Sequence, residues 1–275
     1  MKYKLVASDL DETLLNDEKH VGQKTQEAIA MARDLGVIFV PNTGRGFTLI
    51  HQTLSELNLT EASNEYVISF NGSAITENRN ERVIAKTLMD FATVNTLFQV
   101  GVKNKATMHI YTLTDIYVYN IENDEKNYLD KMGFAYHVFD EPSLDFLQNQ
   151  PLIKMLYKDK ERANLDDLHS QIPQDILTET TCTYSSNRYM EFNKAGINKG
   201  KGLLELAEIL NIKPTEIIAI GDNTNDLSMI RVAGLGVAVQ NAAKEVKDAA
   251  NYVTSNDYNH DAVAEVIKKF ILTNN

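Results

Sequence analysis

Residues 3–13 of the chain read YKLVASDLDET, and the predicted fold is built outward from this stretch. The apolar run at residues 5–7 is long enough for one buried strand. Asp9 and Asp11 follow with one residue between them, so in extended backbone both carboxylates project to the same side. Such a pair at the carboxyl end of a strand is typical of an active site that holds a cation or a shared proton. The alternative is an acidic turn exposed to water.

The composition describes an ordinary globular protein with an acidic surface. A length of 275 residues predicts about two domains, and 43% hydrophobic residues suffice for a core. The net charge of -11 argues against nucleic acid as a partner. Cys182 is the only cysteine, and neither a signal-peptide segment nor a membrane-spanning apolar run is found. We therefore expect a cytoplasmic protein with no membrane partner; the oligomeric state stays open and is compatible with a monomer.

Strand and helix patterns alternate after the first strand. Apolar residues recur at helical spacing over residues 28–35, and a continuous apolar run at residues 37–40 indicates a buried strand. A second helix is predicted over residues 47–57 and a third strand over residues 66–70, closed by the turn pair Asn71-Gly72. This order predicts a parallel sheet with helices on both faces.

The pattern changes after residue 83. Segments of period 2 at residues 107–119 and 182–192 predict two antiparallel hairpins, with helices between them. The alternation of strands and helices returns after residue 192. We therefore predict an α+β domain at residues 84–192, inserted into an α/β domain made of residues 1–83 and 193–275.

Four polar clusters each follow a predicted strand or begin a predicted helix. They are Asp9 with Asp11, Thr43-Gly44-Arg45, Lys199-Gly200 and residues 222–226, DNTND. Because the carboxyl ends of parallel strands meet at one edge of a sheet, we expect these clusters to converge. Each cluster alone also has a structural explanation, as a turn, a helix start or a loop capped by Asn225. Their joint occurrence at these boundaries favours a function.

The combined residues suit the chemistry of phosphate. A carboxylate can attack phosphorus and form an aspartyl phosphate, and Mg²⁺ held by Asp9 and Asp222 would screen the negative charges. Lys199 supplies a positive charge, and Asn225 an amide group. Asp11 is placed to protonate the leaving oxygen and later to accept a proton from water, and we expect its pKa to be raised by the neighbouring charge and by partial burial.

These motifs resemble those of the haloacid dehalogenase superfamily of aspartate-nucleophile phosphatases. Residues 9–13, DLDET, resemble its DxDxT signature, Thr43-Gly44-Arg45 its second motif, Lys199 its third, and residues 221–226, GDNTND, its fourth. The long insertion resembles the type IIB cap of the Cof-like sugar-phosphate phosphatases. The resemblance implies an α/β fold with a Rossmann-like, doubly wound, mainly parallel sheet core and an inserted α+β cap domain.

The resemblance also implies a role for each motif residue. Asp9 would be the nucleophile and a Mg²⁺ ligand, and Asp11 the acid/base that binds the metal through its backbone carbonyl. Asp222 would be the third metal ligand, and Asp226 would orient the metal's waters. The implied phosphate-binding residues are the backbone of Leu10, Thr43 and Gly44, together with Lys199 and Asn225. An aspartate at position 11 favours hydrolysis over dehalogenation, which has no leaving alkoxide to protonate.

In proteins of this kind the cap contributes the substrate pocket. The candidate residues here are His109, Tyr117, Tyr184, Asn187 and Arg188. We expect a Mg²⁺-dependent phosphatase that acts on small phosphorylated metabolites, with sugar phosphates the leading class. Two alternatives stay open: a phosphomutase or phosphotransferase with the same aspartyl phosphate, and a regulator that binds a phosphorylated metabolite without turnover.

Overall fold

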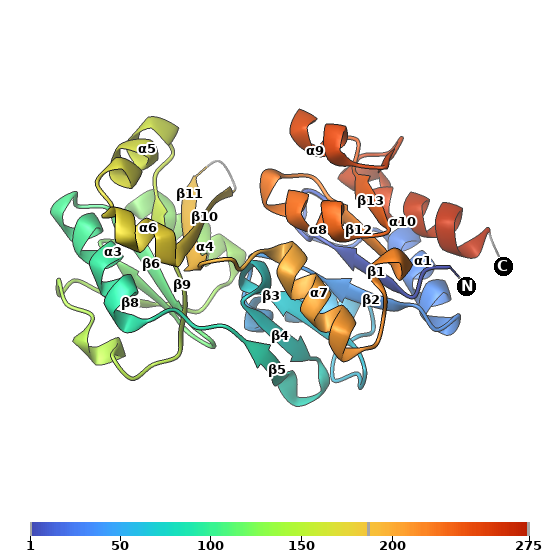
Figure 1. Cartoon of the computed structure of the whole chain (residues 1–275), viewed down its shortest axis with the longest axis horizontal. Coiled ribbons are helices and arrows are strands. Elements are labelled where there is room, and N and C mark those ends of the chain that lie inside the picture. The colour runs from blue at the N-terminus through green and yellow to red at the C-terminus, as the bar shows by residue number, and fades with distance from the viewer. Residues whose placement is uncertain (1, 186–187, 274–275) are drawn as a thin grey trace. The chain divides into compact units, whose positions relative to one another are not determined.

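Strand β1 (Leu5–Ser8) is an inner strand of a five-stranded parallel sheet with the order β14-β13-β12-β1-β2 (Figure 1). The computed structural model describes residues 2–185 and 188–273. On one side β1 pairs with β2 (Ile38–Pro41), and on the other with β12 (Ile217–Gly221). All four residues of β1 are buried, as in a strand covered on both faces. The first and last thirds of the chain therefore meet along one strand.

The residues of the sheet alternate between two helix layers. Leu5 and Ala7 belong to a core cluster that includes residues of α7 (Lys199–Ile209) and α8 (Leu227–Val232). The intervening Val6 is equally buried and points to the opposite face. Helices α1 and α10 pack against each other, and α1 also contacts β2. The other elements of this layer system are α1 (Gln23–Asp34), α2 (His51–Glu56), β13 (Leu235–Ala238), α9 (Lys244–Ala249), β14 (Tyr252–Val253) and α10 (Ala262–Ile267).

The predicted third strand runs parallel to β2 at one bridge, but it lies outside the five-stranded sheet. β3 (Tyr66–Ser69) exists, but it pairs in antiparallel fashion with β4 (Ala74–Glu77), which pairs with β5 (Arg82–Lys86). A single parallel bridge, Asn42 to Ile68, connects β3 to the residue after β2. Only residues 70–73 separate β3 from β4, and a connection this short can join only antiparallel strands.

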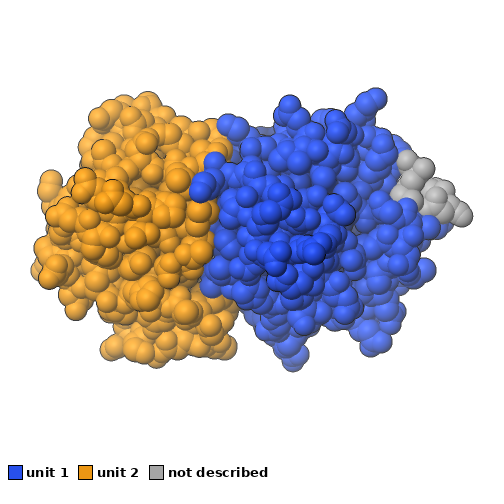
Figure 2. Space-filling view, turned by 90° about the horizontal axis from the view of Figure 1, so that it is seen from below, with its two compact units in different colours: residues 1–86, 198–275 blue, residues 87–197 orange. Residues whose placement is uncertain are grey.

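The chain divides into two compact units (Figure 2). Unit 1 consists of Met1–Lys86 and Asn198–Asn275, and unit 2 of Thr87–Ile197. The sequence pattern changes inside β5 at one junction and inside β11 (Tyr189–Lys194) at the other. Both strands therefore continue a few residues beyond the positions where the sequence pattern changes, and the boundaries between the units lie correspondingly later in the chain.

Unit 2 is built on a six-stranded sheet with the order β10-β11-β9-β6-β7-β8. The two predicted hairpins are confirmed as β6/β7 and β10/β11, and only β7 and β8 pair in parallel. The elements are α3 (Phe91–Lys103), β6 (Thr107–Thr112), β7 (Ile116–Tyr119), α4 (Asn123–Met132), β8 (His137–Phe139), β9 (Leu152–Lys158), α5 (Arg162–Ser170), α6 (Gln174–Glu179), β10 (Thr180–Ser185) and β11.

The architecture confirms the predicted fold class. Unit 1 has the parallel, doubly wound core, and unit 2 is an α+β segment inserted into it along the chain. Among the described residues, no helix combines the length and the apolar character that a membrane crossing requires.

At Gly72 the turn between β3 and β4 packs closely against the start of α7. Its φ is +100°, and a Cβ atom there would lie 2.3 Å from the carbonyl oxygen of Asn198. Gly36, which ends the loop after α1, also has a positive φ of +84°, but no atom lies within 4 Å of its Cβ position. A comparison of substitutions at the two glycines therefore separates the energetic cost of a left-handed backbone from the cost of steric overlap.

We predict that Gly72→Ala lowers the free energy of unfolding by about 2–4 kcal/mol, because it adds overlap with backbone to the cost of a left-handed conformation. Gly36→Ala should cost only the conformational part, roughly 1 kcal/mol. Thermal and urea unfolding followed by circular dichroism measure both. Equal effects of the two variants would contradict the close packing at Asn198.

Candidate active site

Asp9 is held at the carboxyl end of β1. Its backbone N–H donates to the carbonyl of Ile220 at 3.0 Å, which extends the pairing between β1 and β12 by one residue. Its side chain is one-tenth exposed, and Oδ1 accepts a hydrogen bond from the Lys199 ammonium at 2.6 Å. The other oxygen, Oδ2, has no hydrogen-bond partner among the described residues.

Lys199 is the first residue of α7, and its side chain is fully buried. The ammonium group lies between two carboxylates, 2.6 Å from Asp9 Oδ1 and 2.5 Å from Asp226 Oδ1. Close packing of α7 on α8 makes this possible: a Cβ at Gly200 would lie 2.4 Å from the carbonyl oxygen of Ser228. Asn42 Nδ2 donates to the Lys199 carbonyl at 3.1 Å and holds the same turn from the β2 side.

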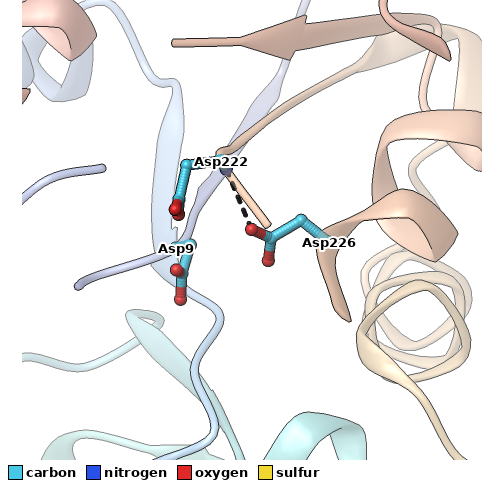
Figure 3. Close-up of side chains that lie close together, drawn as sticks. All are labelled: Asp9, Asp222 and Asp226. Atoms are coloured by element: carbon cyan, nitrogen blue, oxygen red, sulfur yellow. Dashed lines mark hydrogen bonds between the residues drawn. The ribbon is translucent and has the colours of Figure 1, made fainter. Parts of the chain in front are cut away.

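Asp222 and Asp226 come from the loop after β12 (Figure 3). Asp226 Oδ2 accepts from the backbone N–H groups of Asp222 and Asn223, at 2.9 and 3.0 Å. Asn223, and not Asn225, caps the short helical turn that follows. Thr13 Oγ1 donates to Asp222 Oδ1 at 2.9 Å, so the last residue of the DLDET stretch orients a carboxylate from the other end of the chain.

The carboxylates of Asp9, Asp222 and Asp226 form one buried cluster. Each offers an oxygen within 4.8 Å of the others. Burial raises the pKa of Asp9 to about 7, with Lys199 opposing and Asp226 adding to the effect. Burial and the charges of the other two carboxylates raise the pKa of Asp222 to about 9. The Lys199 ammonium pairs with two of the three carboxylates, Asp9 and Asp226, so the cluster favours an additional positive charge.

The donor set fits a hard divalent cation. All three side chains offer carboxylate oxygens, which are the ligands that Mg²⁺ prefers, and the described part of the cluster holds no sulfur or imidazole ligand. Both oxygens of Asp226 already accept hydrogen bonds, from Lys199 and from two backbone N–H groups. Asp9 and Asp222 therefore have the greater capacity to bind an ion directly.

The Thr43–Gly44 segment and Asn225 meet at Asn71, which the sequence analysis names only as part of a turn. Asn71 Oδ1 accepts from Asn225 Nδ2 at 3.5 Å, and it lies 3.1 Å from the Cβ position of Gly44. The Thr43 N–H donates to the Ile68 carbonyl at 2.9 Å, so this amide is already engaged and only the hydroxyl of Thr43 can serve a phosphate. Leu10 is fully buried, and its carbonyl accepts three N–H groups from the next turn.

Asp11 is in a different environment from the one that the sequence predicts. It does not belong to the carboxylate cluster. Its side chain, 39% exposed, accepts hydrogen bonds from Arg45 and Lys19. Burial alone would raise the pKa of Asp11, but the charges of Arg45 and Lys19 outweigh it and lower that pKa below its usual value. The expected rise is wrong because both cations arrive from outside the DLDET stretch.

Unit 2 places its candidate residues in separate surroundings. Buried His109 lies 3.2 Å from Glu125 Oε1, and Arg188 Nη2 donates to Glu125 Oε2 at 2.6 Å. Tyr117 stacks on the ring of His137, and Tyr184 donates to Asp166. Among the candidates that the structure describes, only His109 and Arg188 share a partner, Glu125, which the sequence analysis did not select. Asn187 lies outside the described residues.

Thr13, Asn42 and Asn71 are therefore the supporting residues that the sequence analysis missed. Thr13 ends the DLDET motif and Asn71 begins the Asn-Gly turn pair, so a sequence pattern marks both residues. Asn42 had none, because its partner Lys199 lies far along the chain.

Comparisons with known proteins identify relatives over nearly the whole chain. A family model described as haloacid dehalogenase-like hydrolase matches residues 6–267. "Putative phosphatase YxeH" of Bacillus subtilis (strain 168) is 32% identical over 274 residues, covering 98% of this chain and 99% of that protein. "5-amino-6-(5-phospho-D-ribitylamino)uracil phosphatase YcsE" of the same organism is 31% identical over 271 residues, covering 98% and 96%.

Solved structures share the same fold. A haloacid dehalogenase-like hydrolase from Bacteroides thetaiotaomicron superposes with a TM-score of 0.84 at 29% identity, covering 98% of this chain and all of that one. A structure described as the HAD subclass IIB sugar phosphatase BT4131 gives a TM-score of 0.84 at 24% identity, covering 97% and 98% of the two chains. At that identity the second likeness concerns the fold alone.

We predict that Mg²⁺ raises the melting temperature, and more so at pH 9 than at pH 5. Because the pKa values of Asp9 and Asp222 are raised to about 7 and about 9, from about 4 in an unfolded chain, ionisation of both costs stability as pH rises over this window. Mg²⁺ at 100 times its Kd should add about 2.7 kcal/mol, or roughly 5–10 °C.

Differential scanning fluorimetry across that pH range measures the shift. Asp222→Asn should remove most of it, whereas Asp248→Asn, in an exposed ion pair with Lys244, should leave it unchanged. An equal Mg²⁺ shift in the wild type and in Asp222→Asn would exclude Asp222 as a ligand.

Proposed function

This chain belongs to the haloacid dehalogenase-like hydrolases, and from that membership we propose that it is a phosphatase with Asp9 as its nucleophile. The observation that carries the proposal is the placement of Asp9. Its carboxylate ends a buried strand, lies in one cluster with Asp222, and contacts a buried lysine through only one of its two oxygens. Such an arrangement serves attack on a phosphorus atom better than it serves stability, since burying unbalanced carboxylates is costly.

The first step transfers the phosphoryl group to Asp9. Oδ2 attacks phosphorus, the bond between phosphorus and the ester oxygen breaks, and the leaving oxygen takes a proton from Asp11. Lys199 holds Oδ1 and places its charge beside the transferring group. Asp226 keeps that ammonium in position through a second ion pair. Phosphoryl transfer depends mostly on positioning and charge, which these residues provide.

The second step hydrolyses the aspartyl phosphate. Water attacks phosphorus and gives a proton to Asp11, the bond between phosphorus and Asp9 breaks, and inorganic phosphate leaves. The lowered pKa of Asp11 keeps its carboxyl group ionised, so that it is able to accept a proton in this step. For the first step Asp11 must gain a proton.

We propose Mg²⁺ as the cation, held by Asp9, Asp222 and the backbone carbonyl of Asp11, with Asp226 orienting water around it. When bound, Mg²⁺ neutralises carboxylate and phosphate oxygens and so allows these anions to approach one another. Leu10 and Gly44 would contact the phosphate through backbone N–H groups, Thr43 through its hydroxyl, and Lys199 and Asn225 through their side chains. The contact between Asn225 and Asn71 supports this arrangement, because it orients the amide.

The substrate is proposed to be a small phosphorylated metabolite, with sugar and sugar-alcohol phosphates as the leading class. The relative YcsE is named for a substrate with a phosphorylated ribityl group, which supports an ester on a polyhydroxylated chain. We assign unit 2 the role of a cap that recognises the rest of this substrate, in part through His109 and Arg188. A net charge of -11 disfavours nucleic-acid substrates, and the single cysteine suits the cytoplasm.

We expect Asp9→Asn to abolish release of inorganic phosphate from p-nitrophenyl phosphate, with a loss of at least about 10⁴-fold, because no other group can take up the phosphoryl group. The circular dichroism spectrum should stay that of the wild type. Turnover at the wild-type rate by a correctly folded Asp9→Asn protein would disprove the nucleophile assignment.

Asp11→Asn should slow turnover by about 10²-fold or more, because it removes the proton donor of the first step and the base of the second. Phosphorylated protein should accumulate where hydrolysis is slowed more than attack, which intact-protein mass spectrometry detects as an added phosphoryl group. An unchanged rate would rule out an acid/base role.

Phosphate that passes from the wild-type protein to added glycerol rather than to water would instead indicate a phosphotransferase.

A further inference from the structure

Two cations converge on Asp11 from different loops. Arg45 Nε donates to Oδ2 at 2.9 Å and Nη2 to Oδ1 at 2.6 Å, while Lys19 Nζ donates to Oδ1 at 2.9 Å. Resting on the proposed function, we propose that Arg45 and Lys19 are positioning residues for general acid-base catalysis, which hold the Asp11 carboxyl group in one plane and leave Oδ2 as the oxygen that exchanges the proton.

The stereochemistry of the carboxylate identifies this oxygen. A carboxylate has about four acceptor positions, two on each oxygen. Oδ1 has two donors, from Arg45 and Lys19, whereas Oδ2 has one. Among the described residues, no other group donates a hydrogen bond to the Asp11 carboxylate, so one acceptor position on Oδ2 stays open. A proton shared with a leaving oxygen or a water has only that place to go.

Arg45 is built to hold this orientation. The paired N–H groups of a guanidinium match both oxygens of a carboxylate and so fix its plane. The Arg45 side chain is only 15% exposed. Its backbone is held on both sides, because its N–H donates to Thr43 Oγ1 and its carbonyl accepts from Phe70, both at 3.1 Å. The arginine therefore connects the acid/base to the same loop that carries Thr43 and Gly44.

Lys19 makes the weaker contribution. It approaches from the loop between β1 and α1, its side chain is 41% exposed, and it binds only Oδ1 as a single charge. Its backbone has a φ of +64° and donates to the Asn16 carbonyl at 2.9 Å, which turns the chain back toward Asp11. We therefore expect a larger effect from loss of Arg45 than from loss of Lys19.

Leaving-group dependence separates this role from a structural one. Phenyl phosphate and p-nitrophenyl phosphate have nearly the same shape, but phenolate is the stronger base and needs the acid far more. Arg45→Ala should lower kcat/KM for phenyl phosphate at least tenfold more than for p-nitrophenyl phosphate. Lys19→Ala should show the same bias to a smaller extent. Arg45→Lys and Lys19→Arg should lose less kcat/KM on phenyl phosphate than the corresponding alanine variants.

A double-mutant cycle tests whether Arg45 acts through Asp11. In an Asp11→Asn background, Arg45→Ala should change kcat/KM for phenyl phosphate less than twofold, because the carboxylate that Arg45 positions is already gone. Arg82→Ala and Lys4→Ala, which remove ion pairs with Glu77 and Glu216 in unit 1, are the matched controls and should show no leaving-group bias. Circular dichroism and melting temperature establish folding, with Arg45→Lys as the second variant if Arg45→Ala unfolds.

Two results would overturn the inference. An equal loss on both substrates, or a full additional loss in the Asp11→Asn background, would mean that Arg45 binds the phosphate or supports the loop instead. Failure of the proposed function is distinguishable, because then the wild type would hydrolyse neither aryl phosphate or Asp9→Asn would remain active.

Discussion

The Lys199 ammonium, buried between the carboxylates of Asp9 and Asp226, is the interaction on which the site depends. It connects the end of the first strand to a loop more than two hundred residues later and to the first turn of a helix. A buried charge that loses its partner is costly, so each of the three residues constrains the other two. The parallel sheet brings the three segments to one edge, and the close approach of α7 to α8 at Gly200 allows the lysine to reach them.

The same group of charges makes the site suitable for a cation. One ammonium cannot balance three carboxylates. Burial, together with the charges of the neighbouring carboxylates, therefore raises the pKa values of Asp9 and Asp222. The hydrogen bonds from Thr13 to Asp222 and from two N–H groups to Asp226 orient the oxygens without neutralising them. The fold therefore maintains a site whose carboxylates repel one another until a cation or a proton joins them.

Asp11 illustrates how a neighbouring loop can reverse a prediction drawn from one motif. Its distance along the chain from Asp9 suggests two carboxylates that raise each other's pKa. Instead, Arg45 and Lys19 surround it and lower its pKa. The surroundings of the two aspartates thus differ: Asp9 is held by a buried lysine within a carboxylate cluster, and Asp11 by two cations outside that cluster.

The sequence by itself determined the alternation of strands and helices, the inserted α+β segment, and the family, because these depend on apolar periodicity and on motifs that are local in the chain. It also selected Asp9, Asp222 and Asp226, because groups that follow parallel strands meet at one edge of the sheet, and Lys199 at the start of a helix. It could not predict that β3 turns back into an antiparallel hairpin, that the Thr43 amide is already engaged, or that Asn71 connects Gly44 to Asn225. Only the tertiary structure decided those points and the pairing of Asp11 with Arg45 and Lys19, because each depends on which loops are neighbours in space rather than on any local pattern of residues.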